Sequence, residues 1–193
     1  MKIRIPVSAR KKALLIIDVQ PATLNSAAVS TVRVIRAAIR ATHYPLYVIA
    51  AYHAGLESMF YKQSRWHLPI ERAGAVDEGV LEEVRRKNMN TVVTTKSVRS
   101  VFKCDQRADL MNAMASDEIA EVHVMGYDIN DCVLATAYDA LDLGFYTYVI
   151  EEACNRNDGN KDLVAAAISV LRQQNMTNHS SLDDHEDIEL DIA

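Results

Sequence analysis

The sequence has few cysteines and no long hydrophobic run, and each shortage excludes a class of protein. Its three cysteines, Cys104, Cys132 and Cys154, are an odd number without a CxxC pair, so neither a disulfide framework nor a structural zinc site is supported. The longest apolar runs, ALLII and LYVIAAY, are far shorter than the ~20 residues of a membrane span. No signal-peptide core follows the N-terminal charges. We therefore expect a cytoplasmic protein without a membrane partner.

An excess of positive charge is also lacking. The formal net charge of -5 gives no overall field that would attract a nucleic acid, so no such partner is expected. No GxGxxG or GxxxxGK[ST] motif follows a strand-like run, which argues against a phosphate or nucleotide site. With 193 residues the chain fits a single domain, 1–193. We expect its basic start and its acidic C-terminal tail to be solvated ends.

Strand-like apolar runs alternate with stretches of helical periodicity along the chain. The predicted strands are 13–19, 46–52, 91–95, 121–126 and 145–150. The predicted helices are 29–42, 77–88, 105–115, 131–143 and 159–174. Runs that are apolar on both faces and separated by helices indicate a mainly parallel sheet covered on both sides. The predicted fold is a three-layer, doubly wound, Rossmann-like α/β domain.

Residues 53–76 lack clear periodicity and form a long connection rich in aromatic and basic residues. A connection of this length in a compact domain is usually functional, for example as a lid. We expect the substrate pocket to be lined by Tyr52, His53, Phe60, Trp66 and Phe102. Packing in the core is the alternative for the aromatic members of this set.

Three chemically distinct side chains lie at the ends of predicted strands: Asp18 ends the first, and Lys96 and Cys132 follow two others. Ligands of open α/β sheets bind beyond the carboxyl ends of the strands, so these groups are expected to meet. Lys96 and the positive end of a helix near Cys132 are predicted to lower the thiol pKa, and Asp18 to accept its proton. Taken singly, each has an ordinary structural explanation. Cys104 and Cys154 have no such partners and are expected to pack in the core.

The same residues carry a resemblance to a known family. The stretch LLIIDVQ, then Lys96, Ser100 and Phe102 in TTKSVRSVF, and then G-x5-C-V-x2-T-A-x-D-A-x3-G-F from Gly126 to Phe145 resemble the isochorismatase-like cysteine hydrolases. That superfamily includes nicotinamidases, carbamoylsarcosine amidohydrolase and hydrolases of ureido compounds. The resemblance covers about residues 12–172, and the third motif is its most specific part.

The resemblance implies a catalytic triad of Asp18, Lys96 and Cys132. It also implies a non-proline cis peptide between Tyr127 and Asp128, with the backbone N–H groups of Asp128 and Cys132 forming an oxyanion hole. Cys132 would attack an amide or ureido carbonyl, release ammonia or an amine, and leave a thioester for water to hydrolyse. Homodimers or larger assemblies such as tetramers are also implied.

The sequence departs from the family at the metal-binding position. Metal-binding nicotinamidases carry an Asp-x-His pair after the second strand, whereas this chain has Ala51 and His53. His53 and His67 without the carboxylate make a poor zinc or iron site, and they are better explained as pocket wall and loop residues. We therefore expect no metal and no cofactor.

A second departure is Asp128, which is followed by Ile129 and Asn130 where relatives carry a small residue and Thr. A carboxylate beside an oxyanion hole opposes the developing negative charge unless it points away or pairs with a cation. It would favour a substrate with a positive group. The predicted function is metal-independent hydrolysis of a C–N bond in a small amide or ureido compound. The alternatives are a non-catalytic binding or assembly protein and a vinyl-ether hydrolase like isochorismatase itself.

Overall fold

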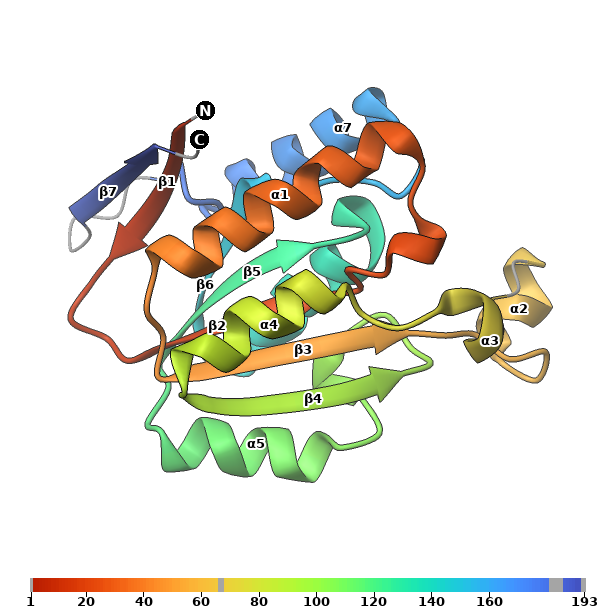
Figure 1. The fold of residues 1–193 in the computed structure, drawn as a ribbon, viewed down its shortest axis with the longest axis horizontal. Helices are drawn as coiled ribbons and strands as arrows, with labels where there is room; N and C mark the ends of the chain where they lie inside the picture. Colours follow the sequence, from red (N-terminus) through yellow and green to blue (C-terminus); the bar gives the residue numbers. More distant parts are fainter. Residues whose placement is uncertain (1, 66–67, 181–185, 192–193) are drawn as a thin grey trace.

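The computed structural model describes residues 2–65, 68–180 and 186–191, and a five-stranded parallel sheet lies at its centre (Figure 1). The strand order is β4-β3-β2-β5-β6, and every neighbouring pair is parallel. These strands are β2 (Lys12–Ile17), β3 (Leu46–Tyr52), β4 (Asn90–Lys96), β5 (Glu121–Gly126) and β6 (Tyr146–Cys154). The predicted fold class is confirmed.

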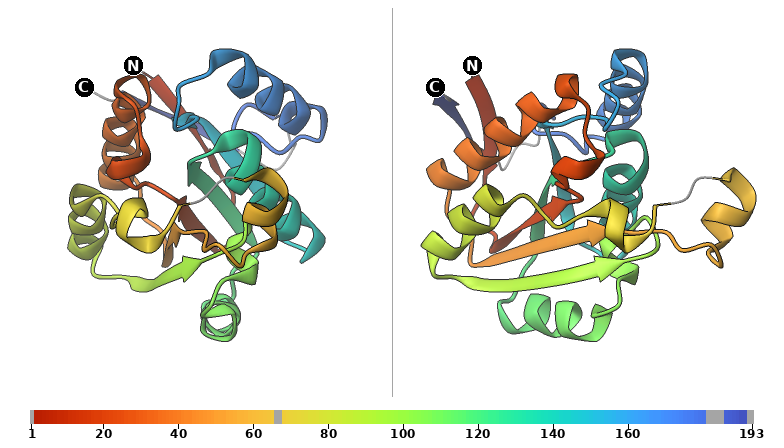
Figure 2. Two further views of the ribbon diagram at one scale, coloured as in Figure 1. Left: turned by 90° about the vertical axis from the view of Figure 1, so that its right-hand side faces the viewer. Right: turned by 45° about the vertical axis from the view of Figure 1, so that its right-hand side comes forward.

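Helices cover both faces of the sheet because its strands are apolar on both faces. In β2, Leu14 and Ile16 belong to one buried cluster and Leu15 and Ile17 to the other, and all four are fully buried. The first face is covered by α1 (Ser26–Ala41) and α4 (Glu78–Lys87). The second is covered by α5 (Arg107–Ser116), α6 (Leu134–Asp142) and α7 (Lys161–Gln173), as Figures 1 and 2 illustrate.

Side-chain caps explain where several helices begin. Asn25 and Asp77 cap α1 and α4 by accepting a hydrogen bond from a backbone N–H of the first turn. Asn160 caps α7 by accepting hydrogen bonds from the backbone N–H groups of Asp162 and Leu163. None of the helices described in the structure is long and apolar enough to cross a membrane.

The two chain ends pair with each other, which the prediction of two solvated ends did not include, although the acidic end stays largely exposed as predicted. β1 (Lys2–Val7) runs antiparallel to β7 (Glu186–Asp191) in a separate two-stranded sheet (Figure 1). The basic start alternates with apolar residues, and Ile3 and Ile5 pack into the cluster beneath α1. The opposite charges of the two ends meet across the pair, with 2.7 Å between Lys2 Nζ and Glu189 Oε2.

The long connection 53–76 lies beyond the carboxyl ends of the strands. It contains α2 (Met59–Ser64) and α3 (Ile70–Ala73), which extend outward from the sheet edge in Figures 1 and 2. Backbone hydrogen bonds between Ala54 and Leu68 close its base, with N–O distances of 2.7 and 3.2 Å. The connection therefore stands next to the sheet edge at which ligands of this fold class bind.

Candidate active site

Asp18, Lys96 and Cys132 come together at the carboxyl edge of the sheet. Asp18 directly follows the central strand β2, Lys96 ends β4, and Cys132 lies in η3 (Ile129–Val133), a π-helical turn that leads into α6. From β2 the chain adds β3 and β4 on one side and β5 and β6 on the other. The strand order thus reverses beside β2, which is where open α/β sheets bind ligands.

Asp18 and Lys96 form a buried ion pair. The distance from Lys96 Nζ to Asp18 Oδ2 is 2.7 Å, and the lysine side chain is 0% exposed. Lys96 Nζ also lies 4.6 Å from the centroid of the Tyr52 ring. The second carboxylate oxygen, Asp18 Oδ1, is buried and accepts no hydrogen bond from any described residue. It is therefore available to accept a proton.

The Cys132 thiol is buried beside both members of this pair and interacts with each. Burial raises the pKa of the thiol well above its ordinary value, and the neighbouring carboxylate of Asp18 raises it further, outweighing the ammonium of Lys96. The prediction of a lowered thiol pKa is wrong for the resting protein, because the motif around Cys132 does not reveal how completely the thiol is removed from water.

The two partners keep the charges needed for proton transfer. Burial alone would lower the pKa of Lys96, but the ion pair with Asp18, together with the smaller effect of Cys132, outweighs it and the pKa is raised, so the ammonium persists. Burial also raises the pKa of Asp18 despite the ion pair with Lys96, which makes this carboxylate a stronger base than an exposed one. The site therefore holds a neutral thiol next to a carboxylate of increased basicity.

The loop between β5 and η3 is bound tightly to the end of β2. Gly126 has φ 126°, and a Cβ at this position would lie 2.0 Å from the carbonyl oxygen of Ile17. The Tyr127 N–H donates to that same oxygen over 2.9 Å. The Tyr127–Asp128 peptide is cis, as the resemblance implied. Only glycine at position 126 allows the loop backbone to lie this close to the Ile17 carbonyl, and this contact fixes the loop beside Asp18.

The Asp128 side chain is directed to the segment after β6. Its Oδ1 accepts a hydrogen bond from the backbone N–H of Asn157 over 2.6 Å. Burial raises the pKa of Asp128 to about 6, against the opposing effects of that hydrogen bond and of Arg156. One carboxylate oxygen of Asp128 is thus held by the Asn157 N–H. This hydrogen bond reduces, without removing, the repulsion that Asp128 would exert on an oxyanion.

Two adjoining cavities lie over these groups. The inner one, of about 40 Å³, is lined by Asp18, Gln20, Thr23, Tyr52, Leu68, Tyr127, Asp128, Asp131, Cys132 and Asn157. The outer one, of about 540 Å³, is lined by Phe60, Arg99, Asp128, Asn130, Asp131, Arg156, Asn157 and Asp158. The two share Asp128, Asp131 and Asn157, so a ligand that enters from the outer cavity passes these three residues to reach the thiol.

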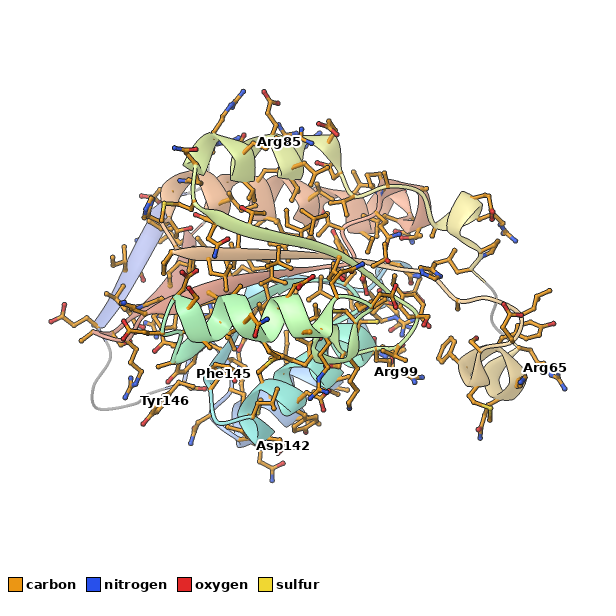
Figure 3. The ribbon with its side chains drawn as sticks, turned by 90° about the horizontal axis from the view of Figure 1, so that it is seen from below. Arg65, Arg85, Arg99, Asp142, Phe145 and Tyr146 are labelled. Carbon is orange, nitrogen blue, oxygen red and sulfur yellow. The ribbon has the colours of Figure 1, made fainter. Side chains whose placement is uncertain are left out.

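Arg99 and Asp131 meet at the mouth of the site. The guanidinium of Arg99 is paired with the Asp131 carboxylate and lies 4.5 Å from the centroid of the Phe60 ring. Figure 3 shows Arg99 at the end of the sheet that faces α2, away from Asp142 and Phe145. This contact connects three segments that are distant in sequence, and all three residues line the outer cavity.

The residues predicted to line one pocket lie at different places in the structure. Tyr52 lines the inner cavity and Phe60 the outer one. His53 lines a neighbouring cavity of about 460 Å³. Phe102 lines neither cavity at the thiol. Its ring is stacked on Phe145 with 5.9 Å between ring centroids, and it lines a separate cavity of about 500 Å³. Trp66 lies outside the described residues.

Gln20 is a positioning residue to which the sequence analysis gave no role. Its side-chain amide donates to the backbone carbonyls of Tyr52, Ala73 and Gly74 and accepts from the Tyr52 N–H over 2.8 Å. It thereby connects the end of β2 to the end of β3 and to α3. A polar residue two positions after Asp18 in LLIIDVQ was the available signal. The contact of Arg99 with Asp131 had no comparable signal.

The residues near His53 do not fit a metal ion. Ala51, two residues before His53, supplies no ligand atom. Across the described part of the chain, no group of three or more His, Cys, Asp or Glu side chains is arranged to hold one. His67 lies outside that part.

Comparison with known proteins agrees with this architecture. Residues 12–181 match the family model of the isochorismatase domain. No curated protein matches the chain significantly. Several solved structures share the fold at low sequence identity.

Three of them illustrate the range. The nicotinamidase/pyrazinamidase PncA from Bacillus subtilis is 23% identical, with a TM-score of 0.62 over 84% of this chain and 94% of that one. The pyrazinamidase of Pyrococcus horikoshii, solved in complex with zinc, is 17% identical, with a TM-score of 0.62 over 85% and 96%. The YcaC gene product of Escherichia coli, an octameric hydrolase of unknown specificity, is 11% identical, with a TM-score of 0.61 over 90% and 76%.

Proposed function

The chain belongs to the isochorismatase family, and from this membership we propose that it is a cysteine hydrolase acting on the C–N bond of a small amide or ureido compound. One observation carries the proposal. The neutral thiol of Cys132, the basic carboxylate of Asp18 and the charged ammonium of Lys96 lie buried side by side at the carboxyl edge of the sheet. A thiol with an adjacent base, itself held by a third group, is the arrangement of an activated nucleophile.

In the first half-reaction the sulfur of Cys132 attacks the carbonyl carbon while Asp18 takes the thiol proton. The C–S bond forms as the C=O bond becomes an oxyanion, for which the backbone N–H groups of Asp128 and Cys132 are the proposed donors. Lys96 stabilises the negative charge as it moves from Asp18 to sulfur. Asp18 then returns the proton to the nitrogen, the C–N bond breaks, and ammonia or an amine leaves a thioester on Cys132.

In the second half-reaction water attacks the thioester carbon and gives a proton to Asp18. The C–S bond breaks, the proton passes from Asp18 to the departing sulfur, and a carboxylic or carbamic acid is released. The ligand atoms around His53 do not fit a metal, so the proposal routes no step through one.

The experiment is a panel of primary amides and ureido compounds, with released ammonia or amine measured for the wild type and two variants. Cys132→Ser is expected to lower turnover by at least about a thousandfold, since it removes the nucleophile. Cys104→Ser is the matched control because Cys104 and Cys132 are each 6% exposed, and it should retain turnover. Near-normal turnover of Cys132→Ser would contradict the proposal.

The alternatives have their own outcomes in this panel. A Cys132→Ala protein that keeps its turnover would favour chemistry without a cysteine nucleophile, such as vinyl-ether hydrolysis. A wild-type protein that turns over nothing and leaves Cys132 unreactive would favour a binding or assembly role. Assembly into a dimer or tetramer and a cytoplasmic location remain predictions, and light scattering on the purified chain tests the first.

A further inference from the structure

Among the described residues, the inner cavity is lined by three carboxylates and by no cationic side chain. Asp18, Asp128 and Asp131 all contribute to it, together with Cys132. Lys96 lies behind Asp18, is 0% exposed and is paired with it. The cavity therefore offers carboxylate acceptors and negative charge to whatever enters.

In the part of the chain that the structure describes, the Asp128 carboxylate has no paired cation. Arg156 is near enough to lower its pKa, against the larger effect of burial, but forms no ion pair with it. Among the described residues no cation lies within ion-pair distance of Asp128. Arg156 is turned to Asp158 through two contacts of 2.8 and 2.7 Å, and it also donates to Asn130 over 3.1 Å. Burial of an ionised carboxylate without a paired cation is unfavourable, and a bound cation would relieve that penalty.

Asp131 continues the negative surface outward from the thiol. It precedes Cys132 in the chain and lines both cavities. Its partner Arg99 contacts it from the mouth and has a side chain that is 48% exposed. Arg99 is paired with Asp131 and Arg156 with Asp158. A cationic group that enters would therefore share Asp131 with Arg99, whereas Asp128, in the described part of the chain, has no paired cation to displace.

We propose that Asp128 and Asp131 form a specificity subsite for a cationic group, an ammonium or guanidinium, carried by the substrate on the side of the carbonyl away from the leaving group. This inference rests on the proposed function. It assigns the substrate class as short amino-substituted amides or ureido compounds. Neutral analogues forgo the charge-assisted hydrogen bonds, and acidic analogues are repelled.

The test compares amides and ureas of graded chain length that end in an amino group with methyl-ended and carboxylate-ended counterparts of equal length. We expect kcat/KM of the wild type to be at least about tenfold higher for the amino compound at the optimal length. Asp128→Asn and Asp131→Asn should each lower that ratio about tenfold. The amide oxygen introduced by Asp128→Asn can still accept the hydrogen bond from the Asn157 N–H, so the fold is retained.

Asp142→Asn is the matched control, because it removes one negative charge from a residue far from the mouth (Figure 3) and should leave the ratio unchanged. A preference for neutral or acidic counterparts at every length, or a ratio unaffected in both subsite variants, would overturn the inference while leaving the proposed function intact.

If the wild type hydrolyses none of these compounds, a binding measurement still tests the cationic subsite separately from the proposed hydrolysis. Calorimetric binding of the same compounds to the Cys132→Ser protein does not need turnover. Tighter binding of the amino compound, weakened by Asp128→Asn, would support the cationic subsite although the proposed hydrolysis had failed. Equal or weaker binding of the amino compound would overturn the subsite as well.

Discussion

At the scale of single residues, the site depends on moving one proton between two buried groups. Cys132 is neutral at rest because burial and Asp18 raise its pKa, and Asp18 has an unoccupied oxygen beside it. A thiolate therefore forms during attack, when Lys96 can compensate the charge on sulfur, rather than before the substrate binds. The reactivity of Cys132 thus comes from the base beside it and not from a standing thiolate.

Asp128 carries a stability penalty that its substitution should reveal. Its pKa is about 6 in the folded protein, against 3.8 ordinarily, so the folded state binds more protons between about pH 4 and 6. Stability from this group therefore falls as pH rises through that window and stays reduced above it. Asp128→Asn should raise the free energy of unfolding by about 1–3 kcal/mol at pH 7.5, where the carboxylate is charged.

Urea unfolding at pH 7.5 and near pH 4 checks this prediction, because the advantage of Asp128→Asn should almost vanish at the lower pH. An advantage of equal size at both values would show that the effect does not come from the carboxylate charge. A gain in stability combined with a loss of cation preference would explain why a destabilising residue is useful at this position.

At the scale of elements, the chain divides into a rigid sheet and an added pair of terminal strands. The active groups stand at the carboxyl ends of β2, β4 and β5, whereas β1 and β7 pack at the other end of the molecule (Figure 1). The terminal pair buries Ile3 and Ile5 against the cluster beneath α1. These strands should therefore contribute to stability without contributing to the site.

Ending the chain after Ser180 tests that separation. Loss of β7 removes the partner strand of β1 and takes Leu190 from its contacts, which should lower the free energy of unfolding by about 1–3 kcal/mol. Denaturant unfolding measures this change, and the alkylation rate of Cys132 reports on the site and should stay as in the wild type. Unchanged stability would contradict the role given to β7, and a changed alkylation rate would contradict its separation from the site.

At the scale of the whole molecule, the sequence predicted what depends on local pattern. Runs such as ALLIIDV and EVHVMG are apolar on both faces, and they form central parallel strands within a few residues of the expected bounds. The motifs around Asp18, Lys96 and Cys132 predicted that these residues would meet, because parallel strands deliver their carboxyl ends to one edge.

Features that depend on distant packing were beyond that reasoning. The pairing of β1 with β7 joins segments about 180 residues apart, and the contact between Arg99 and Asp131 joins two loops with no shared pattern. Phe102 stacks in the core although its motif suggested the pocket. The thiol pKa changed direction because burial, which a sequence does not give, exceeds the effect of Lys96.

The rate of iodoacetamide modification, resolved by peptide mass spectrometry for each cysteine of the native protein, tests the central claim most directly. Cys104, Cys132 and Cys154 are each 6% exposed, so burial alone gives no reason for one to react faster. The account predicts that Cys132 reacts at least about tenfold faster at pH 7.5, because Asp18 takes the thiol proton while the sulfur attacks and Lys96 compensates the charge. Lys96→Met should remove most of this excess. Equal rates for the three thiols, or an excess unaffected by Lys96→Met, would contradict Cys132 as a nucleophile activated by Asp18 and Lys96.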